Sequence, residues 1–537
     1  MHYNDKIKEI LEMPLFNARE KFHISIRDYM DLTIKRMRVI FQSGLVNNDM
    51  WLGQTKQIQF NELCQSLSLW GTFDFSLGIS LCEHLIAGNV LFTQSDASQM
   101  DKYRDEVIQL QRIYSFCCTE IASGTNLRNI KTTVTYDHTQ RRLFLHSPTA
   151  ESCKFWIGHA LYSATIGMVL ARLIVNGCDE GLHWFRVPLR NKENGPLFPG
   201  IYAISCEPRG GLHGNQIAGV RFDQVSLPLD AMMQRYSTIS SQGLYHSQLS
   251  KSRRFTKLFE TFLQERIFPL ILVSGASSVA LYITFKFSQH RAISLEPIYQ
   301  ALITEILFRQ RLYPELLKAL ALDILSNVII RKFQHDWGNK NTHKELQVLV
   351  AVGKFVGSSL GLDILRKCRA MCGSQGFHHY NQIITLQNDY EANITFAGDN
   401  SVMSYQIAKY MIRRNRFKEQ TTIPANRAQQ IEKKVVSGCL QHRFTDTEAQ
   451  ILSYAYALDL ITQEIQKTNI LDSEMLQELQ NNFTHYFSDE NYGNSTEPSI
   501  EKITKIINLI IPPLELITAP IVNADYAEQF TADLYNE

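Results

Sequence analysis

The segment SFCCTEIASGTNLRNIKTTVTYD, residues 115–137, marks a change in the character of the chain. Before it, stretches such as FHISIRDYMDLTIKRMRVIF at 22–41 have the apolar spacing that is typical of amphipathic helices. From Tyr114 to Pro228, β-branched and aromatic residues alternate with polar ones, which predicts strands with one buried face. Helical patterns return after about Ala231 and continue to the end. The pattern predicts a strand-rich domain between two helical regions.

The order of helices, strands and helices predicts an α+β multidomain chain. We expect an N-terminal helical domain at 1–113, a central β-barrel or sandwich domain at 114–235, a C-terminal helical bundle at 236–420 and a second, shortened helical domain at 421–537. The last boundary follows from the polar stretch RRNRFKEQTTIPANR (413–427), which indicates a linker. Strands are expected in six segments, KTTVTYD, RRLFLHS, GMVLARLIV, HWFRVPL, IYAIS and AGVRFDQVSL.

Composition argues against several functions. The chain has 54 Lys and Arg residues against 53 Asp and Glu residues, so it has no electrostatic footprint for nucleic acid or an anionic membrane. The ten cysteines contain no CxxC pair, which argues against a disulfide framework or a zinc site. His378 and His379 with Asp389 are not expected to bind a metal, because adjacent histidines point apart in most backbones. No P-loop, GxSxG or Rossmann motif is present.

The sequence also bears on location. The N-terminus MHYNDKIKEI lacks an apolar signal core and the C-terminus DLYNE is not a peroxisomal address, which predicts a cytoplasmic protein. Ile267 to Phe285 carries no charge over 19 residues, and no second such run is expected. Because Pro269 and Gly275 interrupt it, we predict a helix buried in a bundle and no membrane span.

Four blocks of sequence resemble the acyl-CoA oxidases and the related acyl-CoA dehydrogenases. Residues 115–137 resemble the TE-x-GHG-(S/T)-N…TTATYD segment of the oxidases, and residues 147–190 resemble their SPT…KWW-x-G…H-x-F-x-VP-x-R block. GLDILRKCRAMCGSQGF (361–377) is similar to G-x-x-x-x-R-x-x-CGGxGF, and TFAGDNSVMSYQIAKYMI (395–412) is similar to TFEGDNTVMxxQxAKxLL. The resemblance covers about residues 50–415 in order.

This resemblance implies a homodimeric FAD enzyme that oxidises an acyl thioester at Cα–Cβ, with the acyl group carried by CoA or by a carrier protein. It implies noncovalent FAD held at the dimer interface. The residues that it places against FAD are Thr119 at the flavin ring, Trp156 and Gly158 in the loop packed on the flavin, Arg291 at the pyrophosphate across the interface, the glycine turn at Gly373 and Gly376, and Asp399 in the GDN stretch.

Each of these residues also has a structural interpretation. Thr119 is then a strand residue, Trp156 a core residue and Arg291 a solvated helix end. Gly373 and Gly376 are then a helix C-cap. Some positions depart from the family pattern, namely Ser374, Ile293, Ile306 and the run Gln216-Ile217-Ala218.

The main departure is Ala397, which stands where the family has its catalytic glutamate. Alanine accepts no proton, although its backbone N–H remains available as a donor to the thioester carbonyl. In isovaleryl-CoA and long-chain acyl-CoA dehydrogenases the base lies in a Glu-Arg pair, 26 residues before the arginine that corresponds to Arg291. The same register in this chain gives Glu265, followed by Arg266. The resemblance therefore implies Glu265 as a relocated base.

Alternatives to that interpretation remain open. Glu265 is also explained as a first-turn glutamate of the apolar helix, favoured by the helix dipole. Other carboxylates near the gap in sequence are Asp389, Glu391 and Asp399. The chain is then either a flavoprotein with altered chemistry, such as elimination of a β-leaving group, or a protein of this fold without catalytic activity. The sequence does not decide between oxygen and an electron-transfer partner as acceptor, although the oxidase-like blocks favour oxygen.

Overall fold

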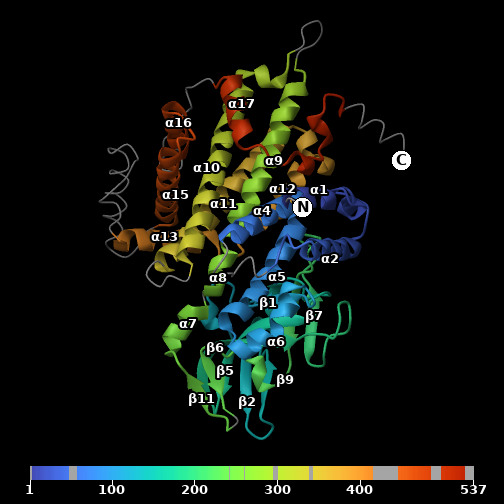
Figure 1. Cartoon of the computed structure of the whole chain (residues 1–537), viewed down its shortest axis with the longest axis vertical. Helices are drawn as coiled ribbons and strands as arrows, with labels where there is room; N and C mark the ends of the chain where they lie inside the picture. The colour runs from blue at the N-terminus through green and yellow to red at the C-terminus, as the bar shows by residue number, and fades with distance from the viewer. Residues whose placement is uncertain are drawn as a thin grey trace. The chain divides into compact units, whose positions relative to one another are not determined.

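The computed structural model describes residues 3–47, 57–240, 242–258, 260–293, 300–337, 343–414, 445–484 and 498–526 (Figure 1). The chain divides into two compact units. Unit 1 comprises Met1–Trp70 and Ser76–Glu265, and unit 2 comprises Gly71–Phe75 and Arg266–Glu537. Unit 1 contains N-terminal helices together with the strands, and unit 2 contains the later helices. The finer division into four domains stays a prediction.

The N-terminal helices are α1 (Tyr3–Leu11), α2 (Ile26–Gln42), α4 (Gln57–Phe73), α5 (Phe75–Gln94) and α6 (Ala97–Ile108). Two of the N-terminal helices, α2 and α6, begin at residues whose side chains cap them. The Ser25 side chain accepts a hydrogen bond from the backbone N–H of Asp28 at the start of α2. Asp96 and Gln99 form a reciprocal capping box at the start of α6. Two short helices, α7 (Lys251–Leu258) and α8 (Glu260–Glu265), end unit 1.

The strands of unit 1 form three sheets. Their bounds are β1 Tyr114–Cys117, β2 Thr133–Asp137, β3 Arg142–His146, β4 Lys154–Ile157, β5 Ile166–Val175, β6 Cys178–Pro188, β7 Ile201–Ser205, β8 Ala218–Phe222, β9 Val225–Leu227, β10 Ser237–Ile239 and β11 Tyr245–Ser247. The largest sheet has the order β1-β5-β2-β3-β9, with β6 also paired to β5. A second sheet has the order β4-β8-β7, and β10 pairs with β11. Each of the six segments predicted as strands contains at least one strand, which confirms those predictions.

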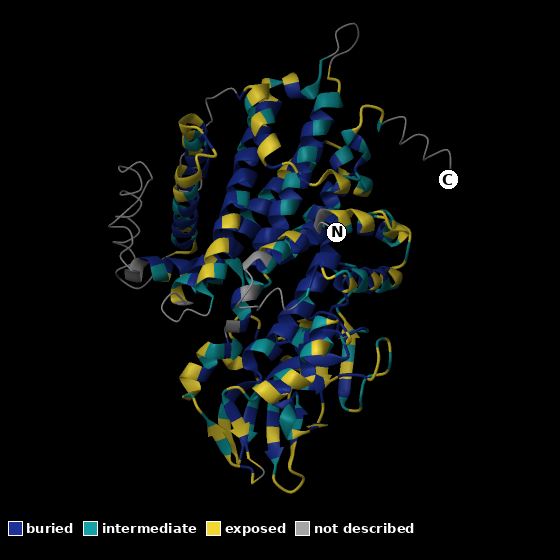
Figure 2. Cartoon of the chain, viewed as in Figure 1, coloured by how far each residue is buried: buried dark blue, intermediate teal, exposed yellow. Residues whose placement is uncertain are grey.

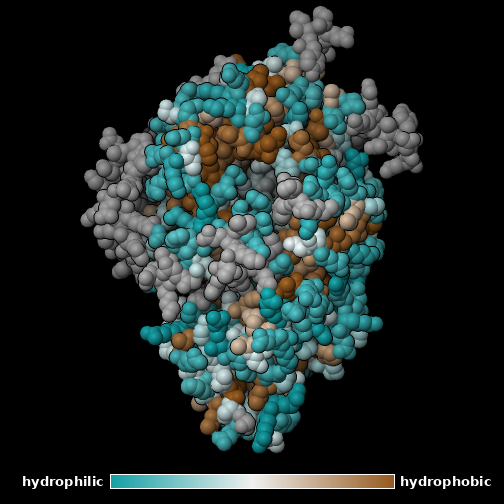
Figure 3. All heavy atoms as spheres, viewed as in Figure 1, coloured by the Kyte–Doolittle hydropathy of each residue, from teal (hydrophilic) through white to brown (hydrophobic). Residues whose placement is uncertain are grey.

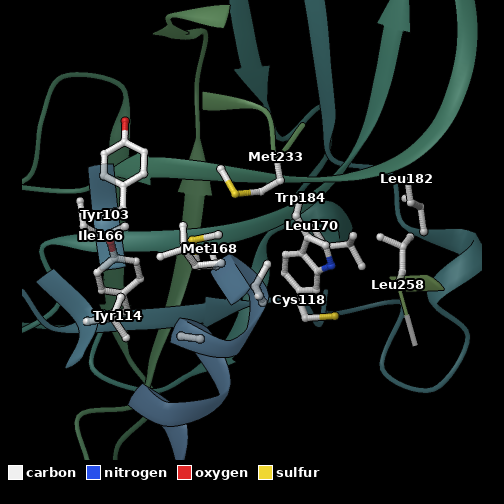
Figure 4. Close-up of a cluster of buried hydrophobic side chains, with 14 of the residues drawn as sticks. Tyr103, Tyr114, Cys118, Ile166, Met168, Leu170, Leu182, Trp184, Met233 and Leu258 are labelled. Carbon is white, nitrogen blue, oxygen red and sulfur yellow. The ribbon is translucent and has the colours of Figure 1, made fainter. Parts of the chain in front are cut away.

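A cluster of buried side chains joins the N-terminal helices to the sheet within unit 1 (Figure 4). Trp184 of β6 is 1% exposed, and it lies close to Leu170 of β5 and to Cys118 in Figure 4. Burial of such large apolar side chains contributes roughly 1.5–3 kcal/mol each. Because Cys118 belongs to this cluster, the core fixes the chain immediately before Thr119.

The helices of unit 2 are longer and largely buried (Figure 2). They are α9 (Phe268–His290), α10 (Ile306–Asp336), α11 (His343–Met371), α12 (Ile383–Tyr390), α13 (Asn400–Arg414), α15 (Asp446–Thr468), α16 (Ser473–Thr484) and α17 (Ile500–Leu509). A Cβ at Gly361 of α11 would lie 2.1 Å from the Val273 side chain of α9, so the glycine permits close packing of these helices. Most of the predicted linker at 413–427 lies outside the described residues.

The surface of unit 2 also exposes hydrophobic side chains. On the face drawn in Figure 3, hydrophobic residues gather near α17, α10 and α9. Ile500 and Leu509 of α17, followed by Ile511 and Leu514, are each at least 41% exposed. Single exposed apolar residues are ordinary on protein surfaces, but these four are close in sequence.

Three stretches are long and apolar enough to cross a membrane by length and composition alone. They are Phe75–Gln94, Lys251–His290 and Lys344–Met371, and between 83% and 89% of their most apolar windows is buried in the structure. Only one of them contains a charge-free run of 19 residues, as expected. The other two include Glu83 in α5 and Lys354 in α11 within otherwise apolar sequence.

A buried ion pair fixes the β4 strand to the turn after β1. The Lys154 side chain is fully buried, and its Nζ donates to the Leu170 carbonyl at 2.7 Å, to the Cys118 carbonyl at 3.0 Å and to Glu120 Oε1 at 3.1 Å. Glu120 in turn accepts from the backbone N–H groups of Lys131 and Thr132 at 2.8 and 2.9 Å. Every Nζ proton therefore has an acceptor, as a buried charge requires.

Lys154→Met is expected to destabilise unit 1 by about 3–5 kcal/mol, because it leaves the Glu120 charge buried without its partner. Native-state hydrogen exchange at the amides of β1 and β4 measures this loss. The matched control is Lys131→Met, which removes an exposed ion pair with Glu151 and should leave exchange unchanged. Unchanged protection in Lys154→Met would show that the pair does not hold the turn.

Candidate functional site

The sequence-predicted site residues fall in both units. Unit 1 contains Thr119, Trp156, Gly158 and Glu265. Unit 2 contains Arg291, Gly373, Gly376, Ala397 and Asp399.

Thr119 lies in the turn that follows β1. Its carbonyl accepts a hydrogen bond from the backbone N–H of Phe155 at 3.0 Å, and its side chain is half-buried. Cys118 before it belongs to the hydrophobic core, and Glu120 after it forms the buried ion pair. The Thr119 side chain is therefore presented from a turn that is anchored on both sides.

Trp156 presents its indole to the surface. It is 58% exposed and its backbone is left-handed, with φ 61°. A bulky residue in this conformation costs roughly 1–2 kcal/mol, and such strain is often found at functional sites. The interpretation of Trp156 as a core residue is therefore wrong. An exposed aromatic ring on a strained, fixed strand suits a flat ligand such as a flavin.

Gly158 is needed because a carboxylate packs against its backbone. A Cβ at Gly158 would lie 1.9–2.2 Å from the carboxylate atoms of Glu83, which belongs to α5. The Gly158 carbonyl accepts a hydrogen bond from Ser115 Oγ at 2.8 Å, which holds the loop in place. Sequence reasoning missed Glu83. Its signal was available, because it is the only Asp, Glu, Lys or Arg in the apolar segment 75–94.

The surroundings of Glu83 favour its protonated form. Burial raises the pKa of Glu83 to about 7, although a hydrogen bond from Asn215 and the positive charge of Arg209 lower it, and Glu265 raises it further. Asn215 Nδ2 donates to Glu83 Oε2 at 2.9 Å, and His159 Nε2 lies 3.8 Å from the same oxygen. The side chain remains 20% exposed, so it is partly accessible to solvent.

Glu265 lies in unit 1, which also contains the turn that carries Thr119. It is the last residue of α8, and α9 begins only at Phe268, so the interpretation of Glu265 as a first-turn residue of the apolar helix is wrong. Burial is the main cause that raises the pKa of the Cys118 thiol, and the charge of Glu265 adds to it. The half-buried Glu265 carboxylate therefore lies within electrostatic range of both Cys118 and Glu83.

In unit 2, Arg291 ends α9 with its side chain exposed. Its backbone N–H donates to the Phe287 carbonyl at 2.8 Å, and its own carbonyl accepts from Leu302 N–H at 2.8 Å. The backbone is thus fixed while the guanidinium faces outward. This geometry fits both a solvated helix end and a cation that binds an anionic ligand.

The glycine turn after α11 has a structural reason. Gly373 has φ 58°, and a Cβ at this position would meet no heavy atom within 4 Å, whereas a Cβ at Gly376 would lie 2.1 Å from the Arg369 carbonyl oxygen. The Gly376 N–H donates to the Cys372 carbonyl at 3.3 Å. Gly373 therefore ends the helix, as the C-cap interpretation expected, whereas Gly376 lies in the 3-10 helix Gln375–Phe377 that follows. Their role toward a cofactor stays a prediction.

Ala397 also has a left-handed backbone, with φ 56°, and Gly398 follows with φ 102°. Asp399 Oδ1 accepts from the Ser401 N–H at 2.9 Å, which caps the start of α13 and gives Asp399 a local structural role. The fully buried Lys354 donates to the Ile394 carbonyl at 3.1 Å and to Asn400 Oδ1 at 2.6 Å. The loop around Ala397 is therefore held at both ends, with its backbone conformation fixed.

The other carboxylates near Ala397 in sequence are committed or buried. Glu391 forms a bidentate pair with Arg366 at 2.7–3.0 Å, and Asp389 is 7% exposed. Among the described residues, no group of three or more His, Cys, Asp or Glu side chains is placed to hold a metal ion. His379 Nδ1 instead forms a hydrogen bond with Thr385 Oγ1 at 2.9 Å.

The positions that depart from the family pattern are mostly explained by their surroundings. Ile293 and Ile306 are 42% and 44% exposed, so neither is a core residue. Gln216 is buried, and its Oε1 accepts from the Ser163 N–H at 2.9 Å. Nothing in the structure explains Ser374.

Comparison with known proteins agrees with this description of the fold. Residues 259–412 match the family described as Acyl-CoA oxidase, C-alpha1 domain. The chain is 24% identical over 415 residues to the peroxisomal acyl-coenzyme A oxidase 3 of Arabidopsis thaliana, which covers 74% of this chain and 61% of that protein. It is 26% identical over 416 residues to the human peroxisomal acyl-coenzyme A oxidase 3, which covers 74% of this chain and 58% of that protein. The chain thus matches less than two thirds of the length of these relatives.

Solved structures extend the similarity along the chain. Arabidopsis thaliana acyl-CoA oxidase 1 superposes with a TM-score of 0.78 at 17% identity, over 99% of this chain and 91% of that chain. Caenorhabditis elegans acyl-CoA oxidase-1, solved in complex with FAD and ATP, superposes with a TM-score of 0.75 at 17% identity, over 99% and 89%. The protein therefore has the acyl-CoA oxidase fold, and the resemblance found in its sequence blocks is confirmed.

The prediction of a cytoplasmic protein was wrong by the same comparisons. Several of the relatives are named as peroxisomal acyl-coenzyme A oxidases, and these names point to the peroxisome. The prediction relied on the last residues of the chain, and a short terminal address is weaker evidence than similarity over hundreds of residues.

The two glycines of the turn after α11 should respond differently to substitution. Gly373→Ala places its Cβ in open space, so it is expected to cost only the roughly 1–2 kcal/mol of a left-handed alanine. Gly376→Ala must displace the Arg369 carbonyl and should lower the unfolding midpoint clearly more. Thermal unfolding of both variants checks this order. Equal midpoints would contradict the packing described for the turn.

Proposed function

We propose that this protein is an FAD-dependent enzyme that oxidises an acyl-CoA thioester at Cα–Cβ, with Glu265 as its base. The observation that carries the proposal is the acyl-CoA oxidase fold together with the family match over residues 259–412. Glu265 ends α8 in the same unit as the turn that resembles the flavin-binding turn of the oxidases. The oxidase relatives also favour oxygen as the final electron acceptor.

The residues present fit FAD as the cofactor. Trp156 offers an exposed ring that the core does not explain, and Arg291 offers an exposed cation on a fixed backbone. The related Caenorhabditis elegans enzymes named acyl-CoA oxidase-1 and acyl-CoA oxidase-2 were solved with FAD bound. When bound, FAD supplies the acceptor for the hydride that leaves Cβ.

Glu265 would remove the proton from Cα of the thioester. A general base contributes typically 10²–10⁴-fold when it is positioned within reach of the proton. This role replaces the carboxylate that Ala397 lacks.

Ala397 would contribute through its backbone. In the acyl-CoA oxidases the N–H at this position helps to hold the thioester carbonyl, and the fixed left-handed loop preserves a backbone N–H in this chain. A preorganised donor at the carbonyl oxygen stabilises the enolate-like charge that develops as the Cα proton leaves. Polarisation of the substrate thus does not depend on the side chain at this position.

The assembly proposed is a homodimer in which Arg291 binds the FAD pyrophosphate of the partner subunit. Arg291→Ala is expected to weaken FAD binding by about 10-fold or more, since a hydrogen bond to a charged group contributes roughly 1.5–3 kcal/mol. Flavin fluorescence titration of the apoprotein measures the dissociation constant. Arg311→Ala, which removes an exposed arginine of α10, is the matched control and should bind FAD normally. Full FAD affinity in Arg291→Ala would refute this role.

Glu265→Gln preserves the shape of the side chain and removes its basicity. This variant is expected to bind FAD and acyl-CoA normally but to reduce the flavin at least ~10²-fold more slowly, the lower end of what a general base supplies. Stopped-flow absorbance of the flavin under anaerobic conditions measures the rate. Glu391→Gln, which alters a carboxylate already paired with Arg366, is the control and should retain the native rate.

Rescue makes this test sharper. Ala397→Glu in the Glu265→Gln background should restore flavin reduction if both positions serve the same proton. Unchanged reduction in Glu265→Gln alone would reject Glu265 as the base. Bound flavin that acyl-CoA does not reduce in the native protein would favour altered chemistry such as elimination, and absence of bound flavin would favour a protein without this activity.

A further inference from the structure

One helix of unit 2, α11, holds the loop that contains Ala397 from both sides. Lys354 Nζ donates to the Ile394 carbonyl at 3.1 Å, before Ala397, and to Asn400 Oδ1 at 2.6 Å, after it. Ser358 lies one helical turn further along α11, and its Oγ accepts from Asn400 Nδ2 at 3.0 Å. The two ends of the loop are therefore attached to the same face of α11.

Close packing fixes α11 against its neighbours in unit 2. A Cβ at Gly353 would lie 2.6 Å from the Ile329 side chain of α10, and a Cβ at Gly357 would lie 2.8 Å from the Leu270 side chain of α9. These glycines let α11 approach both helices closely. Lys354 is therefore carried by an element with little freedom to shift, and groups held on such elements are placed more precisely than groups on loops.

The loop presents a backbone donor that the protein itself does not use. The N–H groups of Thr395 and Phe396 both donate to the Ala392 carbonyl, at 3.1 and 3.2 Å. Within the described residues, the next N–H, that of the half-buried Ala397, donates to no protein acceptor. Backbone N–H groups away from solvent are normally paired, so an unpaired one on a fixed loop is available to a ligand oxygen.

A buried lysine is an unfavourable residue for a purely structural contact at this place. The Lys354 side chain is fully buried, and an ammonium group loses hydration when it leaves water, whereas a neutral donor would bond the same two oxygens. The helix α13 begins at Asn400, and the positive end of its dipole also disfavours a cation nearby. The same positive potential becomes favourable when negative charge develops beside the loop. The unpaired N–H and the buried cation thus favour the same kind of ligand group, an oxygen that gains negative charge.

We propose that Lys354 is a positioning residue for the substrate, because it fixes the loop so that the Ala397 N–H meets the carbonyl oxygen of the acyl thioester. This role rests on the proposed function, in which that N–H polarises the thioester. Lys354 acts through the backbone of Ala397 and does not itself contact the substrate. The donor is then placed by α11 and not by the side chain at position 397.

Isotope-edited infrared spectroscopy of a bound thioester tests this role. The probe is an enoyl-CoA with an isotopic label in its thioester carbonyl, since a product of Cα–Cβ oxidation is not oxidised again at that bond. On the FAD-loaded native protein its C=O stretch should lie at a lower frequency than in water, because the N–H and the positive potential polarise the carbonyl. In Lys354→Met most of this shift should be lost. Flavin reduction by a saturated acyl-CoA should slow by on the order of 10²-fold, as a small misplacement of a reacting group causes.

The matched control is Lys318→Met, which removes another buried lysine of unit 2. Lys318 lies on α10 and is paired with Glu315 and Asp363, so its loss should destabilise unit 2 but leave the carbonyl shift in place. Equal loss of the shift in Lys318→Met would overturn the inference, because general loosening of the bundle would then explain both variants.

A second pair of variants keeps the test decisive if Lys354→Met does not fold. Asn400→Ala removes one anchor of the loop and should lose the shift, whereas Ser404→Ala, which removes a hydrogen bond to the Ser401 carbonyl within α13, should keep it. Absence of the shift in the native protein, or a shift that Asn400→Ala and Lys354→Met leave unmoved, would overturn the inference. Failure of the proposed function looks different: native flavin reduction with an unmoved shift rejects only the role of Lys354, whereas a native flavin that acyl-CoA does not reduce rejects the function.

Discussion

The buried contact between Lys154 and Glu120 is the interaction that fixes the two segments carrying Thr119 and Trp156, which we propose to contact FAD. It joins the turn after β1 to β4 and to the carbonyl of Leu170 in β5. Thr119 lies beside one end of this contact and Trp156 beside the other. A buried ion pair contributes little net stability compared with apolar residues, but it allows few alternative arrangements of the chain around it. The pair therefore defines the position of two segments that are distant in sequence.

The electrostatics around α5 follow from a charge placed in an apolar helix. Burial is the main cause that raises the pKa of Glu83 to about 7. The Glu83 carboxyl group packs against residue 158, where only glycine fits. In unit 2 the loop at Ala397 retains a strained backbone although its side chain is reduced to a methyl group. The structure thus combines a lost carboxylate at one position with a carboxyl group of raised pKa at another.

The sequence predicted the fold well because the strands alternate clearly and the family blocks are ordered along the chain. All six strand segments, from KTTVTYD to AGVRFDQVSL, contain strands.

Side-chain environments were harder to predict. Trp156 is a large apolar residue of the kind usually found in a core. It is nevertheless exposed, and its backbone is left-handed. Glu265 was expected to begin a helix and instead ends one, since the helix is interrupted between α8 and α9. Glu83 was missed although it is the only Asp, Glu, Lys or Arg in the apolar segment 75–94, because only the folded chain shows that it packs against Gly158.

The left-handed backbone at residue 397 has a consequence for the evolution of this protein. The conformational cost of φ 56° applies to alanine as much as to glutamate, because both carry a Cβ. Exchange of one for the other therefore leaves the strain of the loop nearly the same, and the buried contacts of Lys354 and Asn400 are not involved. A lineage can lose or regain a carboxylate here in a single step that is almost neutral for folding. Backbone strain at this position therefore does not favour one of the two residues over the other.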